Sequence, residues 1–167
     1  MGLPRQTGKS VMTSSVGLTA REVMVAGIKT MSPDQRVLDA VQLLLKHRFS
    51  GVPIVDEEKN LMGMLTEKDC IQALLHAVEE NIPPLCIRDV MTTENLITIT
   101  EDTHLLTMAH LFLTNPVRRL PVLRDGRLVG QVSRRDLLRA AMTIFEGSPD
   151  REAAILYLSA IEAEPPI

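Results

Sequence analysis

Two seven-residue stretches place a hydroxyl side chain three positions before an aspartate, a combination that could bind a ligand. They are Gly63-Met64-Leu65-Thr66-Glu67-Lys68-Asp69 and Gly130-Gln131-Val132-Ser133-Arg134-Arg135-Asp136. Each lies where a predicted strand ends and a predicted helix begins. Free N–H groups at a helix start attract anions, and a carboxylate one turn later can accept hydrogen bonds from a diol. An anion site beside a diol acceptor matches the phosphate and the ribose of a nucleotide.

The same residues have a purely structural interpretation. Thr66 and Ser133 are favourable N-cap residues, and an acidic residue at the third helical position completes a capping box. For one copy alone this interpretation is the more common one. The two interpretations are compatible, because one aspartate can serve both purposes.

The similarity between the two halves of the chain extends beyond these stretches. Residues 20–24 match residues 87–91 at a spacing of 67, and Val52–Val55 match Leu120–Leu123 at a spacing of 68. A tandem repeat of this length indicates two copies of one supersecondary unit. The pattern of apolar residues predicts the order strand–helix–strand–strand–helix in each copy.

The expected elements of the first copy include a helix whose start is signalled by Ser32-Pro33-Asp34. They are a strand at 28–31, a helix at 33–47, strands at 52–55 and 61–65, and a helix at 67–79. Those of the second copy are a strand at 96–99, a helix at 101–114, strands at 120–123 and 127–132, and a helix at 134–145.

Proline- and glycine-containing stretches divide the chain. Asn81-Ile82-Pro83-Pro84 ends the first copy, and Gly147-Ser148-Pro149 ends the second and precedes a last predicted helix at 150–163. The predicted organisation is a flexible leader at 1–17, repeats at 18–80 and 87–146, a linker at 81–86, and a C-terminal helix and tail at 147–167.

Composition narrows the class of protein. Of 167 residues, 45% are hydrophobic and 23% charged, which is ordinary for a soluble globular protein. The net charge of −3 gives no support for a nucleic-acid surface, and no apolar run reaches the length of a membrane span. We therefore expect a cytoplasmic protein. The residues suggest neither a metal site nor a nucleophile–base pair, so we also expect that the protein is not an enzyme.

The two copies differ in charge. Residues 23–80 contain six basic and nine acidic side chains, whereas residues 88–140 contain eight basic and six acidic ones. All eight basic residues of the second range are arginines. Arginine suits bidentate contact with phosphate, although a solvated face is the more common reason for a charge cluster.

The flanking motifs complete a recognisable series. They are Arg21-Glu22-Val23-Met24 and Arg88-Asp89-Val90-Met91, Ser32-Pro33-Asp34 and Thr100-Glu101-Asp102, and Gly51-Val52-Pro53-Ile54-Val55-Asp56 and Arg118-Arg119-Leu120-Pro121-Val122-Leu123. Together with the two Gly-x-x-[Ser/Thr]-x-x-Asp stretches, this series resembles the cystathionine-β-synthase (CBS) domain, in the tandem pair called a Bateman module. The resemblance covers residues from about 20 to 143.

The resemblance implies an α/β (α+β) fold of two β-α-β-β-α repeats, packed with pseudo-twofold symmetry, whose short mixed sheets are covered by helices. It also implies two related clefts between the repeats, each able to hold an adenosine compound. Asp69 and Asp136 would then bind ribose hydroxyls, and Thr66 and Ser133 would face the phosphate.

The remaining contacts implied by the resemblance come from both copies. Met64 and Gln131 would line the base pockets. The first strand of the opposite copy would complete each cleft, through Leu96 and Ile97 in one and through Ile28 and Lys29 in the other.

Two arginines make the expected clefts unequal. Arg118 and Arg119 match positions where such modules often place phosphate-contacting basic groups, and the first copy has Ser50 and Gly51 there. We therefore expect the cleft of Ser133 and Asp136 to be the better phosphate site.

The resulting hypothesis is a regulatory protein that binds an adenine nucleotide (AMP, ADP or ATP) as a regulatory ligand, not as a catalytic cofactor. Two modules would pair through their helices into a homodimer, and an unidentified protein would be regulated. The alternatives are a structural module with empty clefts, a binder of S-adenosylmethionine or NAD, and an enzyme that uses the nucleotide as a cosubstrate.

Overall fold

The computed structural model describes residues 17–83 and 85–146. The first repeat contains α2 (Val37–His47), β2 (Gly51–Val55), β3 (Leu61–Thr66) and α3 (Glu67–Glu80). The second contains β4 (Ile99–Thr100), α4 (Leu105–Thr114), β5 (Arg119–Arg124), β6 (Arg127–Ser133) and α5 (Arg134–Glu146). Short segments precede the two repeats, namely α1 (Ala20–Val23) with β1 (Val25–Ala26), and the 3-10 helix η1 (Ile87–Asp89).

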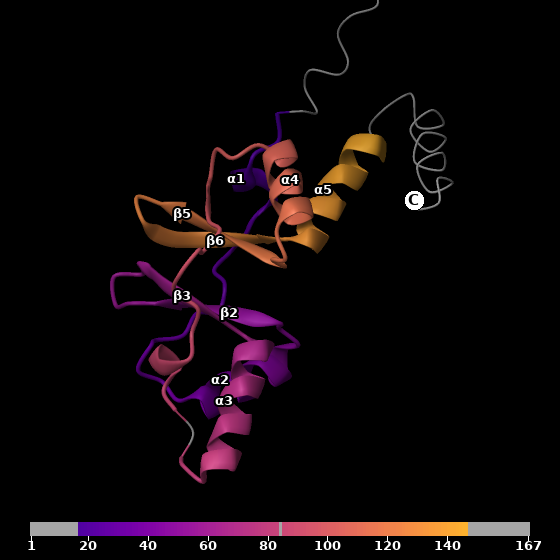
Figure 1. Cartoon of the computed structure of the whole chain (residues 1–167). Helices are drawn as coiled ribbons and strands as arrows, with labels where there is room; N and C mark the ends of the chain where they lie inside the picture. The colour runs from indigo at the N-terminus through magenta and orange to yellow at the C-terminus, as the bar shows by residue number, and fades with distance from the viewer. Residues whose placement is uncertain (1–16, 84, 147–167) are drawn as a thin grey trace, which may run out of the picture.

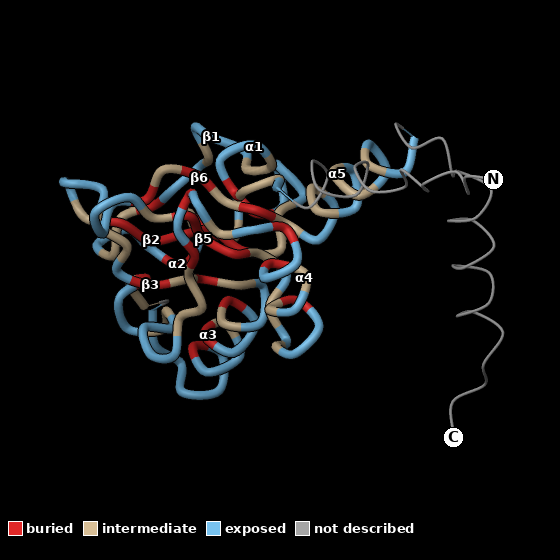
Figure 2. The backbone as a smooth tube through the Cα atoms, turned by 90° about the horizontal axis from the view of Figure 1, so that it is seen from above, coloured by how far each residue is buried: buried red, intermediate tan, exposed pale blue. Residues whose placement is uncertain are grey.

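Two antiparallel hairpins occupy the middle of the molecule, and the long helices lie outside them (Figure 1). The pair β2–β3 forms one sheet, and β5–β6 belongs to a second sheet of order β1-β6-β5-β4. In that second sheet β4 runs parallel to β5, whereas the other neighbours are antiparallel. Buried residues gather on the central strands (Figure 2). The predicted class, short mixed sheets covered by helices, is confirmed.

The N-terminal segment packs against the second repeat rather than the first. The backbone N–H of Ala20 donates to the carbonyl of Thr103 at 2.8 Å, and that of Leu105 donates to Leu18 at 2.9 Å. Ala20 is fully buried in the same core as the residues of α4, β5 and β6. The second folded unit is therefore completed by residues that precede the first repeat.

The segment around η1 makes the reciprocal contact with the first repeat. The N–H of Ile87 donates to Gln35 at 2.9 Å, and that of Val37 donates to Leu85 at 3.1 Å. Ile87 is buried in the core formed by α2, β2, β3 and α3. The two repeats thus exchange their N-terminal segments, and the backbone crosses between them in both directions.

This exchange explains why the first long helix of each repeat begins later than predicted. The sequence suggested helix starts near Ser32 and at 101, but α2 begins at Val37 and α4 at Leu105. The N–H of Ser32 bonds instead to the Gln35 side chain at 2.8 Å, within a turn. Backbone groups of the expected first turns bond to the exchanged segments, so they cannot form helical hydrogen bonds.

The first strand of each repeat also differs from the prediction. In place of a strand at 28–31 the structure has β1 and a single parallel bridge between Met31 and Ile54. In place of a strand at 96–99 it has only β4. Gly27, with φ of +64°, turns the chain after β1, and Asn95, with φ of +53°, turns it before Leu96.

Glycine in the repeated stretches allows the two repeats to approach each other closely. A Cβ atom on Gly63 would lie 2.7 Å from the carbonyl oxygen of Thr92, and one on Gly130 would lie 2.9 Å from that of Val25. Met64 and Thr92 exchange two backbone hydrogen bonds of 2.9 Å, and β1 pairs with β6 at the matching place. A side chain at either glycine would push apart the strands that join the repeats.

Two expectations cannot be compared with the fold. The leader at 1–17, apart from Gly17, and the helix at 150–163 lie outside the described residues. Within the described part of the chain, no helix combines the length and the apolar character needed to cross a membrane.

A buried carboxylate, Glu101, pairs with one arginine of its own repeat and one of the exchanged segment. Glu101 is the only buried charged residue among those described, at 5% exposure. Its carboxylate accepts hydrogen bonds from Nε and Nη2 of Arg124 at 2.5 and 2.6 Å, and Arg21 of α1 approaches it at 3.8 Å. The hydrogen bonds from Arg124 hold the pKa of Glu101 below its usual value.

We predict that Glu101→Gln destabilises the protein at pH 7 and that the difference from wild type disappears in acid. Because the pKa is lower in the folded state, the stabilisation is present above the unfolded-state pKa of about 4.3 and is lost as pH falls through the folded-state value. Urea unfolding of both proteins between pH 3 and pH 7 measures this. Glu94→Gln, at an exposed position, should track wild type throughout, and an equal Glu101→Gln effect at pH 3 and pH 7 would contradict the prediction.

Candidate functional site

A cleft of about 400 Å³ lies between the two repeats, a size typical of small-molecule sites. We call it the first cleft, and the region around Ser133 and Asp136 the second half-site. The first repeat contributes the β2–β3 hairpin and the start of α3, and the second contributes residues 92–97 and the start of β5. Its lining residues are Ser50, Gly51, Met64, Thr66, Glu67, Lys68, Thr92, Asn95, Leu96, Ile97, Pro116, Val117, Arg118, Arg119 and Pro121.

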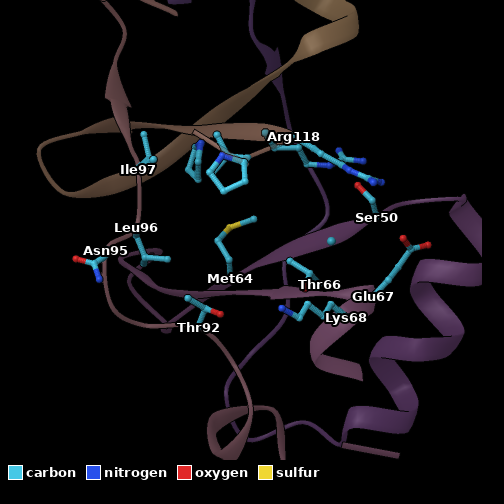
Figure 3. Close-up of a pocket in the computed structure, with 15 residues that line it drawn as sticks. Ser50, Met64, Thr66, Glu67, Lys68, Thr92, Asn95, Leu96, Ile97 and Arg118 are labelled. Atoms are coloured by element: carbon cyan, nitrogen blue, oxygen red, sulfur yellow. The ribbon is translucent and has the colours of Figure 1, made fainter. Parts of the chain in front are cut away.

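One end of the first cleft combines apolar side chains with the polar side chains of Thr92 and Asn95. Leu96 and Ile97 lie together on the strand-like segment of the second repeat, and Met64 of β3 extends toward the middle of the cleft (Figure 3). The family resemblance suggested Met64 for a base pocket, and Leu96 and Ile97 for the strand that completes a cleft. All three line the first cleft.

Polar and charged groups occupy the other end of the first cleft. Thr66 and Lys68 lie at the start of α3, with the Lys68 side chain directed toward the middle of the cleft, and Arg118 extends from the second repeat toward Ser50 and Glu67 (Figure 3). Lys68, Arg118 and the neighbouring Arg119 together outnumber the single carboxylate of Glu67. This end therefore suits an anionic group.

The capping box predicted at Thr66 is present. One carboxylate oxygen of Asp69, Oδ2, accepts hydrogen bonds from the N–H and the hydroxyl of Thr66, both at 2.7 Å. The Thr66 hydroxyl in turn accepts a weaker bond from the N–H of Asp69 at 3.4 Å. Asp69 is the third residue of α3 and is not among the residues that line the cleft.

Arg119 joins the two repeats at the edge of the first cleft. Its guanidinium lies over the ring of Phe49, with 5.4 Å between the guanidinium carbon and the ring centroid, and Phe49 stacks on His47. Burial lowers the pKa of Arg119, and the charge of Asp136 opposes that shift. Its Nε is buried with no hydrogen-bond partner among the described residues. A ligand anion could satisfy that donor.

The structure places Arg118 and Arg119 differently from the arrangement that we expected. We expected both arginines to serve Ser133 and Asp136, but both line the first cleft with Thr66. Arg119 begins β5 opposite Ser133, at the boundary between the repeats, so its long side chain reaches across that boundary. Arg118 and Arg119 thus both line the first cleft, and Arg119 also lies near enough to Asp136 for the two charges to interact.

The second half-site has the same local geometry around Ser133. Oδ2 of Asp136 accepts hydrogen bonds from the N–H and the hydroxyl of Ser133, at 2.9 and 2.6 Å. Gln131 lies on β6 beside β1, and its Oε1 is buried without a partner among the described residues. Ile28 and Lys29 follow β1. None of these five residues lines the first cleft.

Several lining residues were not identified from the sequence. Lys68 lies inside the repeated stretch, so its position could have been noticed. Thr92 and Asn95 belong to the irregular segment before β4, where no pattern marks them. Phe49 becomes relevant only because Arg119 crosses from the other repeat.

The described residues offer little other chemistry. No group of three His, Cys, Asp or Glu side chains within them could hold a metal ion. Cys70 is buried in the core of the first repeat. Burial, with a smaller contribution from nearby Asp69, raises the pKa of the Cys70 thiol, so this cysteine is a poor nucleophile at neutral pH.

Comparison with known proteins identifies the repeats. The CBS domain family matches residues 20–76 and 87–143. Protein MJ1225 of Methanocaldococcus jannaschii is 30% identical over 137 residues, which cover 82% of this chain and 48% of the relative. The chain thus spans about half the length of that curated relative.

Solved structures agree with this match. CBSX2, a CBS-pair protein from Arabidopsis thaliana crystallised with AMP, has a TM-score of 0.69 and 28% identity, covering 77% of this chain and 98% of that one. The CBS domain pair of protein MJ0100, in complex with 5′-methylthioadenosine and S-adenosyl-L-methionine, has a TM-score of 0.62 and 28% identity, covering 73% and 98%. With its duplicated fold and both repeats matched, this chain belongs to the CBS domain family as a tandem pair.

Proposed function

We propose that this protein is a regulatory CBS pair that binds an adenine nucleotide in the first cleft. The observation that supports this most directly is the polarity of that cleft, which is apolar at Leu96 and Ile97 and cationic at Lys68 and Arg118. A nucleotide has the same polarity, with a flat apolar base at one end and phosphate at the other. The capped start of α3 lies between the two ends.

In this proposal each part of the nucleotide meets a group of matching chemistry. The base lies against Leu96, Ile97 and Met64, and the ribose hydroxyls reach past the lining residue Thr66 to donate to Asp69, one helical turn into α3. The phosphate accepts hydrogen bonds from the N-terminal turn of α3 and from Lys68 and Arg118. The AMP complex of CBSX2 supports a ligand of this class.

The charge of the cleft also separates the proposed ligand from the main alternative. MJ0100 binds 5′-methylthioadenosine and S-adenosyl-L-methionine, and the latter has a cationic sulfonium. Lys68, Arg118 and Arg119 would repel a sulfonium placed at their end of the cleft, whereas they attract phosphate. We therefore favour a phosphorylated adenosine compound over a sulfonium compound as the ligand. NAD also contains phosphate and is the second candidate ligand.

The proposed role is regulatory, without catalysis. A ligand in the first cleft contacts both repeats, since Thr66 and Lys68 belong to one and Leu96 and Arg118 to the other. Such a ligand favours the relative orientation of the repeats that makes all these contacts. The orientation then determines the surface presented to a partner protein.

We predict that isothermal titration calorimetry with AMP, ADP, ATP, NAD and S-adenosylmethionine detects binding of at least one phosphorylated compound. Asp69→Ala should weaken that binding roughly tenfold or more, because a charge-assisted hydrogen bond contributes about 1.5–3 kcal/mol. Asp136→Ala should have less effect. Glu57→Ala, on an exposed turn, is the control, and thermal melting establishes that each variant is folded. No binding to the wild type would leave the structural module with empty clefts as the better hypothesis.

We predict that Arg118→Gln weakens AMP binding about tenfold and leaves adenosine binding unchanged, since the guanidinium would contact only the phosphate. Calorimetry with the two ligands measures the difference directly. Arg127→Gln removes the same charge at a distant exposed position and is the matched control. Equal losses for AMP and adenosine would show that Arg118 does not contact the phosphate.

The proposal includes a homodimer formed through the helices. Apolar side chains on the outer helices remain exposed, and on α3 they recur at helical spacing as Ile71, Leu75 and Val78. Leu113 of α4 is 86% exposed and Val78 is 79% exposed. Apolar faces of this kind mark protein interaction sites, and a second copy would supply a face of matching character.

We predict that wild type sediments as a dimer and that Val78→Asp or Leu113→Asp shifts it toward monomer, because a buried unpaired charge strongly opposes association. Sedimentation velocity over a range of concentrations measures the shift. His76→Asp lies on α3 outside the apolar face and should leave the dimer intact. A monomeric wild type would exclude this part of the proposal without affecting the nucleotide site.

A further inference from the structure

The two ribose-binding candidates, Asp69 and Asp136, differ in how much of each carboxylate is available. In both, Oδ2 is occupied, because it accepts the N–H and the hydroxyl of the capping residue. A carboxylate has about four acceptor positions, two on each oxygen. Only Oδ1 therefore remains to receive the two hydroxyls of a ribose.

At Asp69 this second oxygen is free. No hydrogen bond or ion pair reaches Oδ1 of Asp69 from any residue in the described part of the chain. The residue one turn further along α3 is Gln72, which is exposed and forms no side-chain hydrogen bond with Asp69. Oδ1 of Asp69 can accept both hydroxyls of a diol.

At Asp136 the second oxygen is already engaged. Nη1 of Arg139, one turn further along α5, donates to Oδ1 of Asp136 at 3.0 Å. The Asp136 side chain is 11% exposed, whereas that of Arg139 is 68% exposed. Arg139 and Gln72 stand at matching positions, 67 residues apart, in the two repeats. One acceptor position of Oδ1 is left at Asp136, which is insufficient for both hydroxyls.

We infer that Arg139 masks Asp136 and thereby makes the second half-site bind ribose more weakly than the first cleft, so that the first cleft fills first. This inference rests on the proposed nucleotide binding. The residues at 72 and 139 set the order of filling, since a ribose at Asp136 must displace the Arg139 guanidinium or lose one hydrogen bond.

The size of the effect follows from the exposure of Arg139. An exposed ion pair contributes little, so unmasking Asp136 should tighten binding only about two- to fivefold. Salt screens such a pair, so the effect should shrink as ionic strength rises.

Single-site backgrounds test this inference with AMP by calorimetry. In Asp69→Ala, which leaves the second half-site, adding Arg139→Gln should tighten binding about two- to fivefold. In Asp136→Ala, which leaves the first cleft, Arg139→Gln should change nothing and Gln72→Arg should weaken binding by a similar factor. Should either background variant fail to fold, Arg139→Gln in the otherwise unaltered chain should bring the weaker of two AMP sites closer in affinity to the stronger.

Two further measurements identify the cause. Arg127→Gln controls for the loss of one positive charge and should leave both sites unchanged. With a 2′,3′-dideoxy AMP, which has no diol, Arg139→Gln should have no effect.

The possible results distinguish masking of Asp136 by Arg139 from the proposed nucleotide binding. If wild type binds no adenosine phosphate, the proposed function fails. If wild type binds AMP but Arg139→Gln leaves the weaker site unchanged, the masking inference fails and the proposed function stands. If Arg139→Gln weakens that site, Arg139 contacts the ligand instead of masking Asp136.

Discussion

The exchange of backbone hydrogen bonds between the repeats is the constraint on which the rest of the structure depends. Leu18 and Ala20 bond to the second repeat, and Leu85 and Ile87 bond to the first. Neither core is complete without the segment that the other repeat supplies. The repeats are therefore held face to face, and the first cleft exists because they meet along this boundary. The proposed coupling between ligand and repeat orientation would act across this boundary.

The repeated Gly-x-x-[Ser/Thr]-x-x-Asp stretch combines three separate physical roles. Gly63 has no side chain because the carbonyl of Thr92 lies where a Cβ would be. Thr66 caps α3, and Asp69 holds the Thr66 hydroxyl and N–H through one oxygen. The structural interpretation as a capping box is thus fully satisfied, and it still leaves the other carboxylate oxygen available. Structure and proposed binding use different atoms of the same residues.

Small differences on a nearly symmetric frame give the two halves different chemistry. Arg119 reaches from β5 into the first cleft, whereas Gly51, at the matching start of β2, has no side chain to offer. Arg139 engages Asp136, whereas Gln72 leaves Asp69 free. Both differences act in the same direction, because each leaves the first cleft better equipped for a phosphorylated ribose. The two repeats share one backbone fold, and differences in individual side chains make the two sites unequal.

The sequence by itself determined the duplication, the element order, the capping boxes and the family, because these depend on local spacing and apolar periodicity. The family resemblance also suggested Met64 as a base-pocket residue, and Leu96 and Ile97 as residues that complete a cleft. Only the tertiary structure decided which cleft Arg118 and Arg119 line, where α2 and α4 begin, and which oxygen of each aspartate is free. Those features depend on contacts between segments about 70 residues apart, or on the direction taken by a long side chain. The local spacing of residues in the sequence predicts neither of these.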